Sequence, residues 1–129
     1  MSSRTCDIVI LGGGLAGGLA ALAFARARPD LSLCLVEQGE TLGGHHLWSF
    51  FGSDVGKAGR ELLAPLVEAA WPGYTIRFPQ YERQLDTSYY AMTSARLDAA
   101  LRAALPTEAI LCNRRALACS EMAVTLSDG

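Results

Sequence analysis

The sequence has no long hydrophobic run, no excess of one charge and no CxxC pair of cysteines. Half of its 129 residues are hydrophobic, but no stretch approaches the roughly 18 apolar residues that a membrane-spanning helix needs. Eleven Lys and Arg against 13 Asp and Glu give a net charge of −2, so no basic surface is predicted that would bind nucleic acid. The N-terminal residues lead directly into a strand-like pattern without the regions of a signal peptide, and we therefore expect a cytoplasmic protein.

Metal-binding residues are also scarce. The four cysteines lack metal-ligand spacing, and three of them lie in apolar strand-like runs, so we expect reduced, buried thiols. His45 and His46 are the two histidines, and no acidic cluster stands beside them. We therefore predict no metal site.

The first part of the chain, residues 5–45, has the pattern of a βαβ unit. Residues 7–11 form a β-branched apolar run next to glycines, which is typical of a strand buried in a parallel sheet. Residues 15–28 are rich in Ala and Leu and are followed by Pro29, which predicts a helix. Residues 31–36 form a second apolar strand. This order predicts two parallel strands joined by a right-handed helical crossover.

The rest of the chain divides into a partly irregular insert at 46–92 and a final segment at 93–129. The expected elements are a helix over 54–70 with a kink or a late start at Pro65, a half-exposed strand over 74–78, a helix over 93–105 capped by Thr93 or Ser94, a third parallel strand over 109–112, and antiparallel arms over 116–119 and 122–126. Asp128-Gly129 is a strong hairpin turn with no returning strand, so we expect a truncated fragment.

A glycine-rich motif lies between the first strand and the first helix. It fits G-x-G-x-x-G, and its members are Gly12, Gly13, Gly14, Leu15, Ala16 and Gly17. Gly12 would make the tight turn, Gly14 would let a phosphate approach the backbone, and Gly17 would let the helix lie close to the strands. The free N–H groups and positive dipole end at the helix start favour a diphosphate. The motif therefore predicts a dinucleotide site.

Two features further along the chain refine this prediction. Glu37 ends the second strand twenty residues after Gly17, where a carboxylate would accept both hydroxyls of an adenosine ribose and repel a 2′-phosphate. The alternative for Glu37 is a solvated charge at a strand end. Gly43 and Gly44 form a second glycine pair, common in large flavoproteins where the backbone passes close to the flavin side of the cofactor, although a plain loop is the alternative. The pair favours FAD over NAD.

A more specific pattern follows. The run GGHHLWSF at residues 43–50 resembles the GG-x-H-x-W-S-F signature of the bacterial lycopene β-cyclases, with His45 standing where Asn is expected. The other similar segments, in chain order, are residues 63–67 with Trp71-Pro72 and Tyr74, residues 76–79, Leu85-Asp86 with Tyr89-Tyr90, and Thr93-Ser94 with Arg96. The resemblance is collinear over nearly the whole chain.

The resemblance implies a fold and an activity. It implies a Rossmann-like FAD-binding α/β fold of the glutathione-reductase and hydroxylase type, with three parallel strands in the order 3-2-1 and a small antiparallel portion. The whole enzyme would close the ends of lycopene into β-ionone rings, giving γ- and then β-carotene without net redox change. It would need reduced FAD, with NADPH as reductant. The catalytic acid is expected beyond residue 129, so no catalytic residue is assigned and this fragment alone is expected to be inactive.

The resemblance also suggests roles for individual residues. On the cofactor side these are His45, Arg96, whose alternative is a surface salt bridge, and Ala116, whose backbone would face adenine. On the flavin or carotenoid side they are His46, Trp48 and Ser49, with Asp86, Tyr89 and Tyr90 lining the substrate or serving only the sheet.

Other functions and contacts remain open. One is an FAD-dependent oxidoreductase of the same fold, resembling a geranylgeranyl reductase or a monooxygenase, which would consume NADPH or oxygen stoichiometrically. Another is a non-catalytic nucleotide-binding module. Because lycopene is insoluble in water, the full-length protein could contact the inner membrane face peripherally. An unpaired strand at 7–11 would let the fragment self-associate through its edge.

Overall fold

A parallel sheet forms one end of the protein. The computed structural model describes residues 3–127, so the turn expected at Asp128-Gly129 lies outside the described residues. The strands of this sheet are β1 (Ile8–Leu11), β2 (Leu33–Val36) and β8 (Ile110–Leu111), in the order β1-β2-β8. All four residues of β2 are buried, as expected for a strand with a neighbour on each side. The predicted order of the three parallel strands is confirmed.

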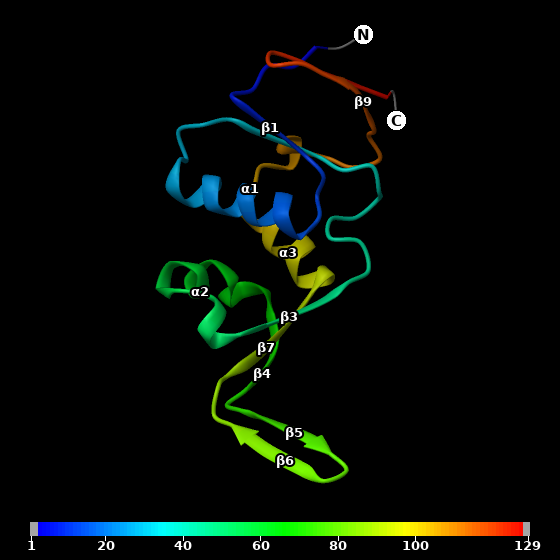
Figure 1. The fold of residues 1–129 in the computed structure, drawn as a ribbon. Coiled ribbons are helices and arrows are strands. Elements are labelled where there is room, and N and C mark those ends of the chain that lie inside the picture. The colour runs from blue at the N-terminus through cyan, green and yellow to red at the C-terminus, as the bar shows by residue number, and fades with distance from the viewer. Residues whose placement is uncertain (1–2, 128–129) are drawn as a thin grey trace.

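Two helices pack on one side of this sheet, as Figure 1 shows, and they are α1 (Leu15–Ala27) and α3 (Ser94–Ala104). The two helices can approach closely at Gly18 of α1 because glycine has no side chain. A Cβ atom at this position would lie 3.0 Å from Leu97 and 3.1 Å from Leu101, both fully buried leucines of α3. Thr93 caps α3, since its Oγ1 accepts the N–H of Arg96 at 3.3 Å. The two helices expected from alanine and leucine spacing are therefore confirmed.

A second sheet, antiparallel, lies beyond these helices (Figure 1). Its strands are β3 (Leu47–Phe51), the central β7 (Tyr89–Thr93) and β4 (Val67–Trp71). The segment between β3 and β4 holds a turn at Gly52–Asp54, helix α2 (Lys57–Leu63) and a 3-10 turn at Ala64–Leu66.

The helix expected over residues 54–70 is wrong in its second half. α2 ends at Leu63, and Pro65 lies in the 3-10 turn, where its missing N–H costs no α-helical hydrogen bond. Val67–Trp71 is instead strand β4, paired with β7 from Val67↔Met92 to Trp71↔Tyr89. Pairing with a strand distant in sequence overrides the helical preference of the alanines here.

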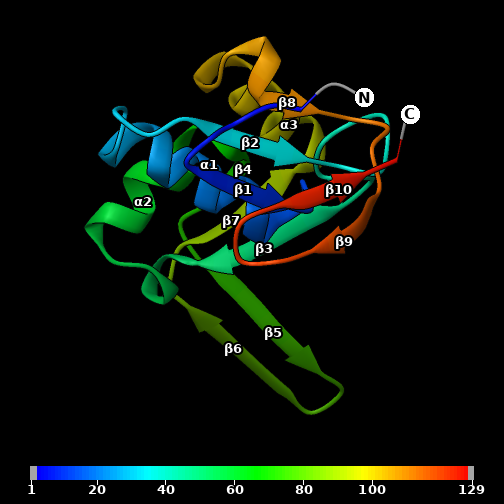
Figure 2. The same ribbon diagram turned by 90° about the horizontal axis from the view of Figure 1, so that it is seen from above.

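Two hairpins complete the fold. Strands β5 (Tyr74–Phe78) and β6 (Tyr81–Leu85) form a hairpin that projects from the rest of the protein in two perpendicular views (Figures 1 and 2). Strands β9 (Ala116–Cys119) and β10 (Val124–Leu126) pair antiparallel after β8. The strand predicted at 74–78 and the two antiparallel arms are confirmed.

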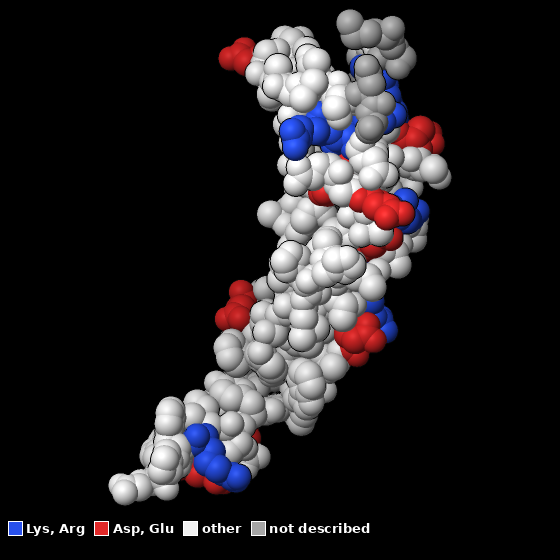
Figure 3. All heavy atoms as spheres, turned by 90° about the vertical axis from the view of Figure 1, so that its right-hand side faces the viewer, with Lys and Arg blue, Asp and Glu red and all other residues white. Residues whose placement is uncertain are grey.

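On the face drawn in Figure 3, acidic and basic side chains are interspersed without a large patch of either sign.

The parallel sheet, α3 and the segment around α2 share one hydrophobic core. Its buried leucines are Leu33, Leu35, Leu42, Leu63, Leu66, Leu97, Leu101 and Leu105.

The cysteines fit the sequence prediction only in part. Cys34 is buried, whereas Cys119 is exposed, because β9 and β10 form a two-stranded sheet whose β9 side chains all face solvent. Within residues 3–127, no helix combines the length and apolarity needed to cross a membrane.

Candidate functional site

The glycine-rich turn has the geometry its sequence suggested. Gly12 adopts a φ of +100°, which L side chains rarely adopt, and its N–H donates to the Val36 carbonyl at 2.8 Å. A Cβ atom on Gly17 would collide with the carbonyl oxygen of Gly12, so only glycine lets α1 approach the strand this closely. A Cβ atom on Gly14, in contrast, would meet nothing within 4 Å. The turn is therefore closely packed between Gly12 and Gly17, and it has open space beside Gly14.

The first turn of α1 has no side-chain cap. Gly14 is the N-cap residue, and no side chain accepts the N–H groups that follow it. No acidic side chain lies in the first turn either, so its positive dipole end has no charge partner from this segment. This helix start can accept an anion.

Glu37 lies directly against the glycine turn. Its Oε2 accepts the N–H of Gly13 at 2.8 Å, and its Oε1 accepts the N–H of Gly39 at 2.7 Å. The side chain is half-buried at the end of β2, so these two bonds fix the plane of the carboxylate. An ionised carboxylate has about four acceptor sites, which leaves capacity for hydroxyl donors.

A cavity of about 250 Å³ opens beside Glu37. Its lining comes from the ends of β1 and β2 and from the segment after β8, and consists of Leu11, Gly12, Val36, Glu37, Gln38, Arg114, Arg115 and Ala116. The structure thus places the predicted Glu37 and Ala116 in one cavity with the first glycine of the motif.

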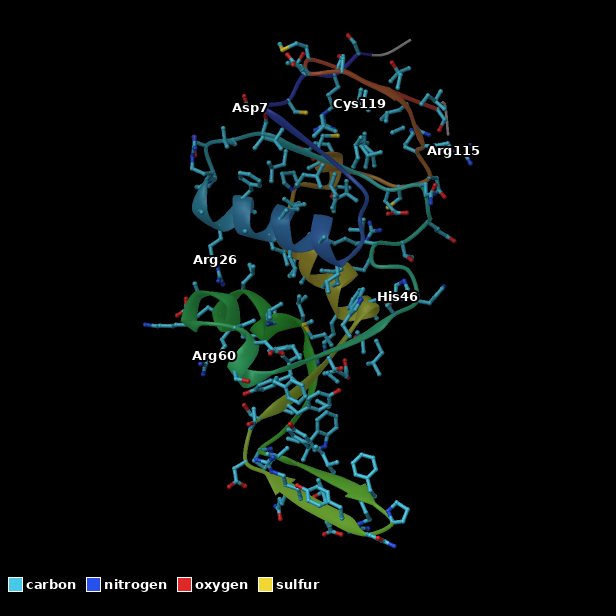
Figure 4. The ribbon with its side chains drawn as sticks, in the orientation of Figure 1. Asp7, Arg26, His46, Arg60, Arg115 and Cys119 are labelled. Carbon is cyan, nitrogen blue, oxygen red and sulfur yellow. The ribbon has the colours of Figure 1, made fainter. Side chains whose placement is uncertain are left out.

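Gln38, Arg114 and Arg115 were not singled out from the sequence. The available signal was the pair of arginines directly after the third predicted parallel strand. Main-chain bonds hold this segment against β2, because the N–H of Arg114 donates to the Glu37 carbonyl at 3.0 Å and that of Asn113 donates to the Gly39 carbonyl at 2.9 Å. Figure 4 shows Arg115 where the chain turns toward β9.

The second glycine pair touches the first glycine motif. The N–H of Gly43 donates to the Gly13 carbonyl at 2.7 Å, and both Gly43 (φ +81°) and Gly44 (φ +63°) adopt left-handed conformations that favour glycine. His45 and His46 follow as exposed residues, with His46 beside the start of α3 (Figure 4). The loop therefore returns to the turn at which α1 begins.

Arg96 forms a surface salt bridge. Its Nε lies 2.6 Å from Oε2 of Glu68 on β4, and both side chains are about half exposed. Arg96 does not line the cavity beside Glu37.

The residues expected on the substrate side lie on two faces of the antiparallel sheet. Trp48 packs against the core, and the ring of Tyr90 stacks on Phe50, which also packs there, at 5.0 Å. Ser49 lies on the opposite face because side chains alternate along a strand, and its Oγ accepts the hydroxyl of Tyr89 at 2.7 Å.

A group of four aromatic rings lies where the outward face of this sheet meets the β5–β6 hairpin, three on the sheet and one on β5. Its members are Phe51, Trp71, Tyr74 and Tyr89, with neighbouring ring centroids 5.1 to 6.3 Å apart. The ring of His46 lies 5.6 Å from that of Trp48, and Asp86 is exposed just before β7. Within the described part of the chain, no three His, Cys, Asp or Glu side chains are grouped so that they could hold a metal ion.

Fold and site together define an α/β protein in which a glycine turn, a strand-end acid and a cavity lie side by side. The family described as "Lycopene cyclase protein" matches residues 7–128. The lycopene beta-cyclase of Pseudescherichia vulneris is 46% identical over 99 residues, which are 77% of this chain and 26% of that protein. The lycopene beta-cyclase of Pantoea ananas is 39% identical over 90 residues, 70% of this chain and 24% of that protein. That of Paracoccus sp. (strain N81106 / MBIC 01143) is 39% identical over 99 residues, 76% of this chain and 26% of that protein.

The chain therefore belongs to the lycopene cyclase family. It spans about a quarter of the length of the relatives that it matches. The resemblance inferred from the run at residues 43–50 is confirmed.

Proposed function

We propose that this chain is the FAD-binding part of a lycopene β-cyclase, in which the adenosine of FAD occupies the cavity beside Glu37. The observation that carries the proposal is the position of Glu37, whose carboxylate is fixed at the glycine turn by Gly13 and faces a cavity of about 250 Å³. The family membership and the names of the relatives support the cyclase activity.

The residues around the cavity suit an adenosine. Glu37 would accept the two ribose hydroxyls with the acceptor sites that Gly13 and Gly39 leave free. Because Glu37 would accept the 2′-hydroxyl directly, a 2′-phosphate would meet its negative charge at close range, and this contact favours FAD over NADP although Arg114 and Arg115 line the same cavity. Ala116 would offer its main chain to the adenine ring, and the arginines at 114 and 115 would border the site.

The diphosphate of FAD would lie at the start of α1. Gly14 has open space where a side chain would otherwise stand, and the uncapped helix start supplies N–H donors and a favourable dipole. The arrangement of β1, α1 and β2 supports a Rossmann-like FAD-binding fold. The contact of Gly43 with Gly13 supports FAD over NAD, because it brings the second glycine pair alongside the diphosphate position.

The substrate would lie on the far side of the flavin from the adenosine. The four aromatic rings, three on the antiparallel sheet and Tyr74 on β5 beside it, form an aromatic surface that would suit a hydrocarbon such as lycopene. Reduced FAD, with NADPH as reductant, would supply an electron-rich ring that stabilises the cationic transition state of cyclisation. Because lycopene dissolves in lipid rather than water, we also propose peripheral membrane contact for the whole protein.

The test has a binding arm and an activity arm. In the first, the protein is titrated with FAD, ADP and NADP while flavin or intrinsic fluorescence is followed; FAD and ADP bind, and NADP binds at least tenfold more weakly. In the second, this chain replaces the matched segment of the Pseudescherichia vulneris cyclase in cells that accumulate lycopene. β-Carotene forms with the wild-type segment and fails to form with Glu37→Ala.

Two results would contradict the proposal. One is a soluble, wild-type protein that binds neither FAD nor ADP. The other is a chimera that consumes NADPH stoichiometrically and yields a reduced or hydroxylated carotenoid, which would favour the oxidoreductase.

We also propose that two copies of the described segment associate through β1. This strand pairs with β2 on one side only within residues 3–127, and Val9 and Leu11 are 39% and 44% exposed. Light scattering over a hundredfold range of concentration tests this, with a Val9→Lys variant as the control that should remain monomeric. A constant monomer mass for the wild-type protein would exclude it.

A further inference from the structure

Helix α3 holds the second glycine pair from both ends. Oδ1 of Asp98 accepts the N–H of Leu42, the residue before the pair, at 2.9 Å. Oγ of Ser94 accepts the N–H of His46, two residues after the pair, at 3.2 Å, and the N–H of Ser94 donates to the His46 carbonyl at 3.0 Å. Because Ser94 and Asp98 are four residues apart, they lie on one face of the helix.

Both side chains are held in place. Oδ2 of Asp98 accepts Nε of Arg102 at 2.9 Å, one helical turn further along, and this carboxylate raises the pKa of the Arg102 guanidinium. Ser94 is buried at 9% exposure, and a Cβ atom on Gly43 would lie 3.0 Å from the Ser94 Cβ. The loop therefore packs directly on the helix.

The held loop in turn contacts the glycine-rich turn. Gly43 donates its N–H to the Gly13 carbonyl, and the fully buried Leu42 packs over Gly13. Neither Ser94 nor Asp98 lines the cavity beside Glu37. Their contacts lead to the second glycine pair and not to the adenosine side of the site.

We propose that Ser94 and Asp98 are positioning residues that fix Gly43-Gly44 for the flavin half of the cofactor. This rests on the proposed FAD site. FAD should depend on the fixed loop, whereas ADP, which has no flavin half, should depend mainly on the glycine turn and Glu37. Loss of either side chain should therefore weaken FAD binding selectively.

The test compares FAD with ADP. Asp98→Ala removes the acceptor for Leu42, and Ser94→Ala removes the acceptor for His46. Each should raise the Kd for FAD about fivefold to tenfold, the size expected for one buried hydrogen bond, while the Kd for ADP changes less than twofold. Asp98→Asn keeps an oxygen acceptor and should restore most of the FAD affinity. Asp30→Ala, which removes an exposed carboxylate paired with Arg28, is the matched control and should change neither Kd.

The outcomes separate this inference from the proposed function. If the wild-type protein binds neither FAD nor ADP, the proposed function fails. If the wild-type protein binds both, the positioning role is overturned by Ser94→Ala and Asp98→Ala proteins that lose FAD and ADP affinity equally, or by alanine variants with wild-type FAD affinity. Should Asp98→Ala fail to fold, Ser94→Ala gives the same test because its Cβ atom, and so its packing against Gly43, is retained.

Discussion

The carboxylate of Glu37 accepts the main-chain N–H of Gly13 at 2.8 Å, across 24 positions of sequence. This one bond joins the end of β2 to the turn at which α1 begins. It holds an acid at the glycine turn through contacts within the protein alone, so the position of that side chain does not depend on a ligand contact. A site arranged in this way avoids part of the entropy cost of binding.

Glu37→Gln tests the charge and the acceptor role together. The glutamine oxygen can accept either Gly13 or Gly39, but its NH₂ group then faces the other N–H donor. We expect at least tenfold weaker ADP and FAD binding and a loss of about 1–2 kcal/mol in the free energy of unfolding. Fluorescence titration and urea unfolding measure the two effects. Unchanged affinity for ADP would show that the carboxylate takes no part in ribose binding.

Substitutions at Gly14 and Gly17 should have different effects, the first on FAD binding and the second on the stability of the fold. Gly14→Ala places a methyl group in open space at a φ of −73°, so stability should be unchanged while a diphosphate is blocked and FAD affinity falls. Gly17→Ala drives a methyl group into the Gly12 carbonyl and should cost about 1–3 kcal/mol in unfolding free energy. Thermal unfolding and FAD titration of both variants check this. A stable Gly17→Ala protein, or a Gly14→Ala protein with full FAD affinity, would contradict the assigned roles.

The sequence predicted the elements whose information is local. β1, α1 and β2 follow from a β-branched run, an alanine-rich segment and a second apolar run, and α3 follows from Thr93 as its cap. The positions of the glycines were also predictable, because each answers a backbone requirement within a few residues. The sequence assigned Glu37 to the ribose hydroxyls, but its hydrogen bond to the N–H of Gly13 was seen only in the structure.

The remainder depends on contacts between distant segments. Val67–Trp71 reads as helix in isolation and becomes a strand only because β7, about twenty residues later, supplies its partner. Ser49 and Trp48 were grouped together, although the strand alternation of β3 sends them to opposite faces. The roles of Asp98 and of the arginines at 114 and 115 require the tertiary position of the loop after β2, which no local pattern specifies.

Asp7 should make folding stability depend on pH. Its Oδ2 accepts both the N–H (2.8 Å) and the hydroxyl (2.7 Å) of Ser32, and these bonds lower the pKa of Asp7. A lowered folded pKa means that the stabilisation is present above the ordinary carboxyl value of about 3.9 and is lost as pH falls through the folded value. Asp7→Asn should therefore lower Tm at pH 7, with the difference from wild type narrowing below about pH 4. Glu61→Gln, an exposed carboxylate on α2, is the control; a pH-independent Tm difference for Asp7→Asn would refute the linkage.

The cysteines should differ in reactivity. Burial raises the pKa of the Cys34 thiol, whereas Cys119 is exposed on β9. Iodoacetamide should modify Cys119 first, and Cys34 only as the protein unfolds, because the thiolate is the reactive form. Peptide mass spectrometry over time measures the order. In Cys119→Ser, the fastest phase should disappear, and rapid labelling of Cys34 in the folded protein would contradict the buried position.

Strand β7 ends at Thr93 and α3 begins at Ser94, so no linker separates the antiparallel sheet from the helix that carries Ser94 and Asp98. The backbone of Thr93 still pairs with Leu47 in the sheet, and the next residue, Ser94, already accepts the N–H of His46. The direction in which β7 leaves the sheet therefore sets the direction of α3, and with it the position of the loop at Gly43-Gly44.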